Sequence, residues 1–205
     1  MISEAKSVRV AYTIFSFSTV IESGALDFDQ PMPAILVLTG ASGAGKTTLL
    51  RTFAMGAPFD VSCHYFDTVG VPPPEEMVRT HGSPEAWQRA MTHQWIAKLH
   101  SGDGRAAVAV LDAQVRPTFV KEAFSACRVT RGTIVLVDCA PAVRHARLIE
   151  NRQQPELVTR DMDAWAAYLK GQADALGLPL LDTTTANVVE SVAALRTLVE
   201  TARSA

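Results

Sequence analysis

The stretch Gly40-Ala41-Ser42-Gly43-Ala44-Gly45-Lys46-Thr47 lies between the apolar residues 34–38 and the apolar pair Leu49-Leu50. Its glycines let successive backbone N–H groups converge without obstruction by a Cβ atom, and a helix beginning near Lys46 adds the positive end of its dipole. Such a loop between a strand and a helix binds the phosphates of a nucleotide. The pattern predicts that Lys46 reaches the β- and γ-phosphates and that the Thr47 hydroxyl ligates Mg²⁺. The expected nucleotide-binding residues are Gly40, Ala41, Ser42, Gly43, Ala44, Gly45, Lys46, Thr47 and Thr48.

Length and composition indicate one domain. The 205 residues, 48% of them hydrophobic, are enough for a single α/β domain with a sizeable core. The net charge of −2 gives no electrostatic footprint for nucleic acid, and no stretch approaches the roughly 18 apolar residues of a membrane span. The three cysteines are widely spaced and odd in number, which favours a reducing, cytoplasmic setting. We therefore expect neither a nucleic-acid nor a membrane partner.

Short apolar runs alternate with helical patterns from residue 34 onward. This alternation predicts a three-layer α/β fold of the P-loop NTPase kind, a five-stranded parallel sheet with helices on both faces. The expected strands are 34–39, 61–66, 106–111, 133–138 and 178–182. Helices are expected after the Ser83-Pro84 cap, over 161–176, and from 188 to the end of the chain.

The chain before residue 34 shows a different pattern. Val8, Val10, Tyr12 and Ile14 alternate with less apolar residues, which is the period of a half-buried strand. We expect residues 1–33 to form an extra strand or hairpin packed on the domain that residues 34–205 make.

Aspartates follow three of the expected strands, at Asp67, Asp112 and Asp138. In an open parallel sheet, the carboxyl ends of the strands form the edge at which ligands bind. Asp112 closes a buried strand, so we expect it to hold Mg²⁺ together with Thr47. Its neighbour is Ala113, where many ATP-hydrolysing machines carry a glutamate that activates water, and this disfavours a motor ATPase.

Asp67 stands where an acceptor hydroxyl would lie if the sheet faces a substrate. A carboxylate there can accept the hydroxyl proton or orient the hydroxyl for attack on the γ-phosphate. An aspartate before a loop rich in glycine and proline is also a common turn residue, so this second interpretation stays open. The sequence of residues 67–70 resembles the Asp-x-x-Gly motif of a GTPase switch. Only 20 residues separate it from Lys46, and no Asn-Lys-x-Asp guanine motif follows the fourth strand, so we discount a GTPase.

Arginines provide a third group of candidate catalytic residues. Arg116 follows Asp112 by four residues, with the amide of Gln114 between them, and its guanidinium can bind a phosphate oxygen. Arginines near the γ-phosphate stabilise the charge that spreads over its oxygens, and a mobile lid can bring them in. Two alternatives stay open: Arg116 can be a surface arginine before a loop, and the arginine helix can simply present a solvated face. The expected lid, residues 144–160, carries Arg144, Arg147 and Arg152, with Asn151 on the face of the first two and with Val143, Ala146 and Ile149 on the other.

These motifs together resemble the small P-loop kinases related to nucleoside monophosphate, shikimate and gluconate kinases. The resemblance covers about residues 34–201 and rests on the phosphate loop, Asp67, the pair Asp112 and Arg116, the arginine helix and residues 180–184. It implies ATP and Mg²⁺ as cofactors and a position near adenine for residues 182–184. The stretch from Asp112 to Arg116 is similar to the Asp-Gly-Phe-Pro-Arg motif of adenylate kinases, with Ala113 and Val115 in place of its glycine and proline.

Two functions fit the sequence. The first is an ATP-dependent phosphotransferase that moves the γ-phosphate of Mg-ATP to a small hydroxyl-bearing acceptor, with residues 68–100 on the acceptor side. The second is a regulatory ATPase or nucleotide-dependent binding module, in which ATP orders residues 68–83 and 152–160 for a partner. The sequence names neither the acceptor nor the oligomeric state.

Overall fold

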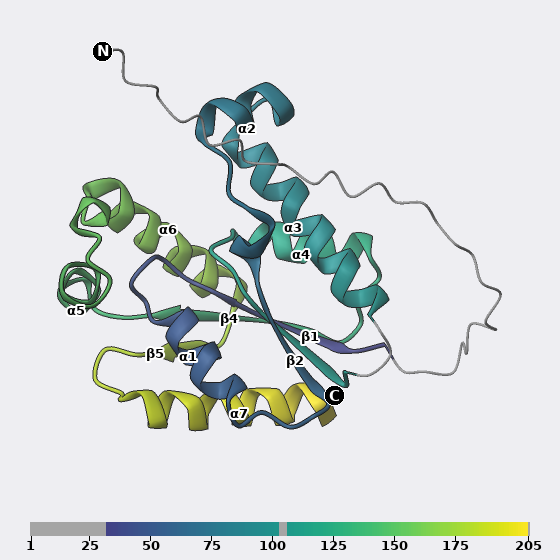
Figure 1. Cartoon of the computed structure of the whole chain (residues 1–205). Coiled ribbons are helices and arrows are strands. Elements are labelled where there is room, and N and C mark those ends of the chain that lie inside the picture. The colour runs from purple at the N-terminus through teal and green to yellow at the C-terminus, as the bar shows by residue number, and fades with distance from the viewer. Residues whose placement is uncertain (1–31, 103–105, 205) are drawn as a thin grey trace, which may run out of the picture. The chain divides into compact units, whose positions relative to one another are not determined.

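The structure is a computed structural model that describes residues 32–102 and 106–204 (Figure 1). The strand or hairpin expected within residues 1–33 therefore lies outside the described residues, apart from Met32 and Pro33. None of the described helices combines the length and the apolar character that a membrane crossing requires.

The described core is a five-stranded parallel sheet with the strand order β2-β3-β1-β4-β5. All six residues of the central strand β1 are buried, as expected for a strand covered on both faces. This confirms the α/β fold and the five strands. The strands are β1 (Ala34–Thr39), β2 (Val61–Tyr65), β3 (Val108–Asp112), β4 (Gly132–Asp138) and β5 (Leu180–Asp182).

Helices connect the strands and cover both faces of the sheet. They are α1 (Lys46–Ala54), the 3₁₀ turn η1 (Phe66–Val69), α2 (Pro74–His81), α3 (Pro84–Ser101), α4 (Pro117–Ala126), α5 (Pro141–Ala146), the π-helical turn η2 (Arg147–Asn151), the 3₁₀ turn η3 (Pro155–Leu157), α6 (Arg160–Leu176) and α7 (Val188–Ser204). As expected, Ser83 caps α3 by accepting a hydrogen bond from the N–H of Ala86.

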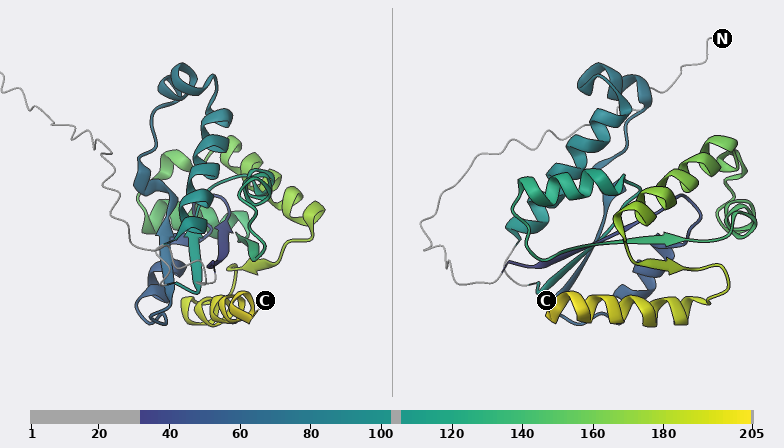
Figure 2. Two further views of the ribbon diagram at one scale, coloured as in Figure 1. Left: turned by 90° about the vertical axis from the view of Figure 1, so that its right-hand side faces the viewer. Right: turned by 180° about the vertical axis from the view of Figure 1, so that it is seen from behind.

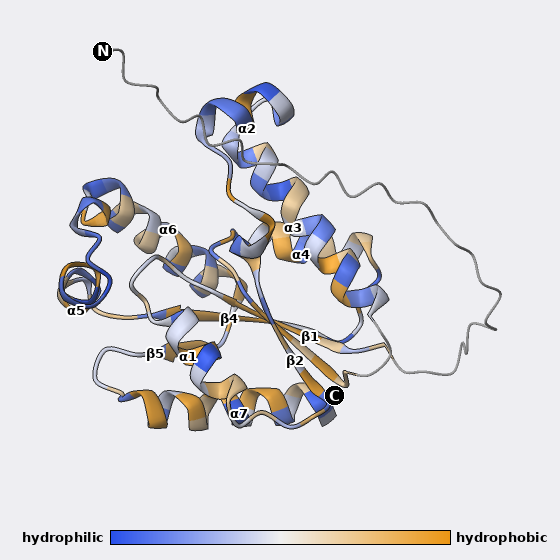
Figure 3. Cartoon of the chain, in the orientation of Figure 1, coloured by the Kyte–Doolittle hydropathy of each residue, from blue (hydrophilic) through white to orange (hydrophobic). Residues whose placement is uncertain are grey.

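Alternate residues of β1 define the two halves of the core. Leu36 and Leu38 pack with α1 and α7, whereas Ile35 and Val37 face α3 and α4. Figures 1 and 2 show α7 on one face of the sheet and α3 and α4 on the other. The apolar colour in Figure 3 is concentrated in the strands between these layers. Because all neighbouring strands are parallel, their carboxyl ends lie at a single edge of the sheet.

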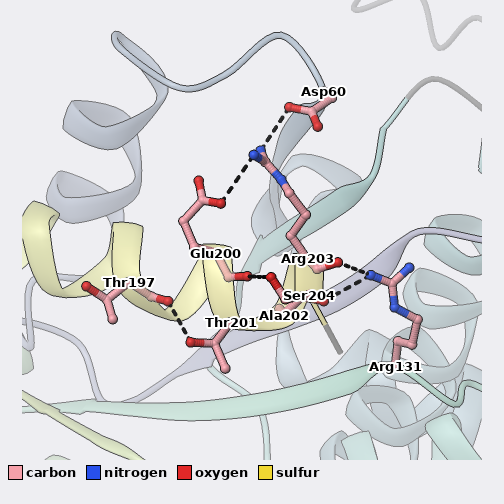
Figure 4. Close-up of polar contacts among 8 residues, drawn as sticks. All are labelled: Asp60, Arg131, Thr197, Glu200, Thr201, Ala202, Arg203 and Ser204. Carbon is pink, nitrogen blue, oxygen red and sulfur yellow. Dashed lines mark hydrogen bonds and ion pairs between the residues drawn. The ribbon is translucent and has the colours of Figure 1, made fainter.

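The end of α7 is anchored by guanidinium groups (Figure 4). Nη2 of Arg131, just before β4, donates to the carbonyls of Ala202 and Arg203 at 3.1 and 2.7 Å. Arg203 in turn pairs with Asp60, just before β2, at 2.9 Å. These bonds satisfy carbonyls that the helix end leaves without intrahelical partners, and they fix α7 beneath the sheet.

Two strands, β3 and β5, each start two residues later than expected, and the arginine helix departs from its expected form. β5 starts at Leu180 rather than at 178, because Pro179 has no N–H to donate to a neighbouring strand. The arginine helix does not continue as an α-helix but widens to a π-helical turn after Ala146, which rotates the residues that follow. In this turn Leu148 is fully buried, whereas the side chain of Ile149 is 49% exposed.

Candidate active site

The phosphate loop follows β1 and has a backbone conformation that favours glycine, as Gly40 and Gly43 show. Gly40 has φ +152° and Gly43 has φ +81°. A Cβ atom at Gly40 would lie 2.1 Å from the carbonyl oxygen of Val137, and one at Gly43 would lie 2.8 Å from Cγ of Arg144. The loop is therefore pressed against the end of β4 and the start of the lid.

Lys46 opens α1 and folds back into the loop. Its Nζ donates to the carbonyls of Gly40 and Ala41 at 2.8 and 3.1 Å, and the residue is only 7% exposed. Burial lowers the pKa of Lys46, and the negative charges of Asp112 and Asp67 counteract part of this shift. The amino group thus sits at the centre of the loop, where phosphate oxygens can replace the carbonyls as its acceptors.

Thr47 and Asp112 meet beside the loop. The Thr47 hydroxyl donates to Oδ2 of Asp112 at 2.6 Å, and Asp112 ends the fully buried strand β3. Burial raises the pKa of Asp112, against the opposing effects of the Lys46 charge and the Thr47 hydrogen bond. Two hard oxygen donors next to a phosphate site fit Mg²⁺, which takes one or two protein oxygens and completes its shell with water and phosphate. These two residues would hold the ion.

Replacing Asp112 by asparagine separates metal binding from stability. We expect Asp112→Asn to raise the Mg²⁺ concentration needed for nucleotide binding roughly 10–100-fold. The apo protein should melt no lower, because burial disfavours the ionised carboxylate. In the wild type, Mg²⁺ binding should weaken on acidification at a higher pH than for an ordinary aspartate, since the pKa is raised. Calorimetric titration at several pH values measures the Mg²⁺ requirement and its pH dependence. Thr47→Ser, which keeps the hydroxyl, is the control. An unchanged Mg²⁺ requirement would remove Asp112 from the metal site.

A pocket of about 440 Å³ opens between the loop, α1, η2 and the segment after β5. Among the described residues no carboxylate lines this pocket, so its charge suits a polyphosphate. Arg51 was not predicted from the sequence, although it lies one helical turn beyond Thr47 and Thr48, on the same face of α1. The cationic lining residues are Lys46, Arg51, Arg147 and Arg152.

The three expected lid arginines have different surroundings. The guanidinium of Arg147 donates to the Thr183 hydroxyl at 2.8 Å, to the Thr183 carbonyl at 2.7 Å and to the Ala44 carbonyl at 3.4 Å. Arg144 is buried, pairs with Asp163 at the start of α6, and does not line the loop pocket. Arg152 is exposed and lines the pocket, and within the described residues no hydrogen bond or ion pair engages its side chain. Its charge also lowers the pKa values of Lys46 and Asp112.

The pairing of Asp163 with Arg144 predicts an acid-sensitive contribution to stability. Hydrogen bonds from His145 and Arg144 hold the pKa of Asp163 below its ordinary value of 3.8. The contribution is therefore present above pH 3.8 and lost as the pH falls through the lower folded pKa.

We expect Asp163→Asn to melt below the wild type at neutral pH, because buried Arg144 loses its carboxylate, and the gap to close in acid. Thermal unfolding from pH 7 to pH 2 tests this. Asp161→Asn, a change at an exposed residue of the same helical turn, is the matched control and should leave the melting curve unchanged. A gap that is constant over the whole range would contradict the ionic origin.

Asp67 and Arg116 flank the other side of the loop. Asp67 is exposed in η1, directly after β2, and its charge acts on both Lys46 and Asp112. Arg116 is less available than its sequence position suggests. Its Nη1 donates to Oε1 of Gln88 at 2.8 Å, and its side chain is 21% exposed. Sequence reasoning missed Gln88, whose position in a helix carries no signal for a partner 28 residues away.

The segment after β5 was expected near the adenine base. Thr183 is buried and lines the loop pocket, which places this segment beside the candidate nucleotide site. The Asp182 carboxylate accepts hydrogen bonds from the N–H and hydroxyl of Thr184, which lower its pKa, and it closes the turn rather than lining the pocket.

No protein-family model matches the sequence, and no curated protein is similar to it. Solved structures are similar in fold. Shikimate kinase from Acinetobacter baumannii in complex with shikimate superposes with a TM-score of 0.55 and 18% identity over 84% of this chain and 95% of that one. A sugar kinase from Janibacter sp. HTCC2649 gives 0.52 and 16% over 85% and 98%, and shikimate kinase from Bacteroides thetaiotaomicron gives 0.50 and 21% over 83% and 99%. The chain therefore has the fold of the small P-loop kinases of the nucleoside monophosphate, shikimate and gluconate kinase group.

Proposed function

We propose that the protein is an ATP-dependent phosphotransferase that transfers the γ-phosphate of Mg-ATP to a hydroxyl group of a small acceptor. The observation that carries the proposal is the convergence of Lys46, the Thr47–Asp112 pair and Asp67 at one edge of the sheet. The fold shared with shikimate kinase and a sugar kinase supports it. The proposed acceptor is a small hydroxyl compound.

The donor half of the site consists of the loop and the metal pair. Backbone N–H groups of residues 40–48 and the Lys46 amino group bind the phosphates. Thr47 and Asp112 would hold Mg²⁺, and the ion would supply neutralising charge to the phosphates. Arg152 is the arginine best placed to stabilise charge on the transferred group, because its side chain is not engaged elsewhere in the described chain. Arg144 and Arg147, which have structural partners, position the loop and its neighbours.

Asp67 is assigned to the acceptor. The acceptor oxygen attacks the γ-phosphorus in line, its proton passes to the Asp67 carboxylate, and the bond from the γ-phosphorus to the bridging oxygen of ADP breaks. Ala113, buried beside Asp112, has no carboxylate with which to activate water. This favours transfer over hydrolysis.

A substrate panel tests the proposal. The protein is incubated with Mg-ATP and, in turn, nucleosides, nucleotides, sugars, sugar acids, aminoglycosides and RNA 5′ ends, and mass spectrometry detects a phosphorylated product. We expect one class of small acceptor to be phosphorylated, at roughly 1–100 turnovers per second on the true substrate. Release of phosphate from ATP without a product on any acceptor would argue against a kinase and for the regulatory nucleotide-binding module.

A further inference from the structure

The segment that follows β3 is fastened directly to the end of β1. The Thr39 hydroxyl donates to the carbonyl of Val115 at 2.5 Å, and the N–H of Ala113 donates to the carbonyl of Leu38 at 2.9 Å. Thr39 is fully buried and immediately precedes the first glycine of the phosphate loop. Residues 113–116 therefore form a fixed platform next to the loop.

Gln88 bonds to this platform from α3. Its Nε2 donates to the backbone carbonyl of Gln114 at 3.2 Å, and its Oε1 accepts from Nη1 of Arg116 at 2.8 Å. The side chain of Gln114, in turn, accepts from the hydroxyl of Ser42 in the phosphate loop at 2.9 Å. Both ends of the Gln88 amide are thus engaged, which fixes its orientation. A continuous series of hydrogen bonds runs from the phosphate loop to the second turn of α3.

Arg116 extends the series to α6. Its guanidinium lies 4.9 Å from the ring centroid of Trp165 and 5.8 Å from that of Tyr168, and these two rings stack at 5.5 Å. Such cation–π contacts are stronger when the cation is partly shielded from water, as Arg116 is. Arg116 therefore contacts both the acceptor-side helix α3 and the helix α6.

We propose that Gln88 is a positioning residue that links nucleotide occupancy of the phosphate loop to the order of the first turns of α3. A phosphate that fixes the loop also fixes Ser42 and Gln114, and through the Gln88 amide it suppresses local opening of α3. Ordering of the acceptor side would then follow binding of the donor. The inference rests on the proposed nucleotide site and deepens it, but it does not depend on which acceptor is used.

Hydrogen exchange tests this link in the full chain. The probe is a non-hydrolysable ATP analogue with Mg²⁺, and the readout is amide protection in residues 84–92, with calorimetry measuring analogue affinity in parallel. In the wild type we expect the analogue to slow exchange about fivefold, the lower end of typical coupling. Gln88→Leu, which keeps the size but removes the hydrogen bonds of the side chain to Gln114 and Arg116, should lose most of this protection while analogue affinity changes less than about threefold.

The control is Gln94→Leu, a change at an exposed residue of the same helix, which should keep the wild-type response. Gln114→Met lies outside α3 and removes the side-chain oxygen that accepts from Ser42. It should reproduce the Gln88→Leu result, so the test still works if one variant does not fold. If the bound analogue protected residues 84–92 in both variants as much as in the wild type, the proposed role of Gln88 would be overturned, but the nucleotide site would not. Absence of analogue binding to the wild type would instead overturn the nucleotide site, and the link with it.

Discussion

Lys46→Ala should abolish phosphoryl transfer while leaving the fold intact. The amino group is the cation at the centre of the phosphate loop, and its loss removes a preorganised charge from the phosphates that accumulate negative charge during transfer. We expect the rate to fall about 10²–10³-fold or more, as for removal of one preorganised donor. The melting temperature should not fall substantially, because burial of Lys46 already disfavours its charged form.

The measurement combines turnover on the acceptor found in the panel with thermal unfolding. Lys121→Ala, a change at an exposed lysine of α4, is the control and should alter neither. Wild-type kinetics in Lys46→Ala would refute the assignment of the phosphate loop as the donor site. A large drop in melting temperature would instead give Lys46 a structural role.

Asp67→Asn should separate transfer from nucleotide binding. The variant retains the size and one acceptor oxygen of the side chain but cannot take the hydroxyl proton, so transfer should fall roughly 10²–10⁴-fold, the usual contribution of a general base. Mg-ATP affinity should be nearly unchanged, because Asp67 does not line the pocket that holds the cationic residues. Steady-state kinetics and calorimetry with Mg-ATP measure the two quantities separately.

Asp174→Asn, at an exposed position of α6, is the matched control for the loss of one negative charge. If Asp67→Asn weakened ATP binding with transfer intact, Asp67 would belong to the nucleotide site. If it changed neither quantity, the turn interpretation of this aspartate would be correct.

Much of the fold could be predicted because it depends on local patterns. A buried parallel strand is a short apolar run, so the five strands were found with boundary errors of one or two residues. The Ser83 cap and the glycine after α6 are also local signals. The π-helical turn was not predictable, since its widened register follows from packing Leu148 into the core.

The arginines show the same division within the candidate site. Arg144, Arg147 and Arg152 look alike in the sequence, because a guanidinium on a helix can serve an ion pair, a backbone carbonyl or a phosphate equally well. Their partners are 19 and 36 residues away for the first two, at Asp163 and Thr183. Only the packed chain distinguishes the two that are held in place from the one that is available.

The sequence by itself determined the phosphate loop, the strand that delivers it and the aspartate beside it, because the spacing of glycines, lysine and threonine encodes that geometry over eight adjacent residues. The tertiary structure decided what the loop touches. Arg147 of η2 donates to the Ala44 carbonyl, and Gln114, which follows β3 and is itself held by Gln88 of α3, accepts from the Ser42 hydroxyl. These contacts exist because the parallel sheet brings the carboxyl ends of its strands to one edge. Local sequence thus fixed the loop motif, and long-range packing fixed which side chains surround it.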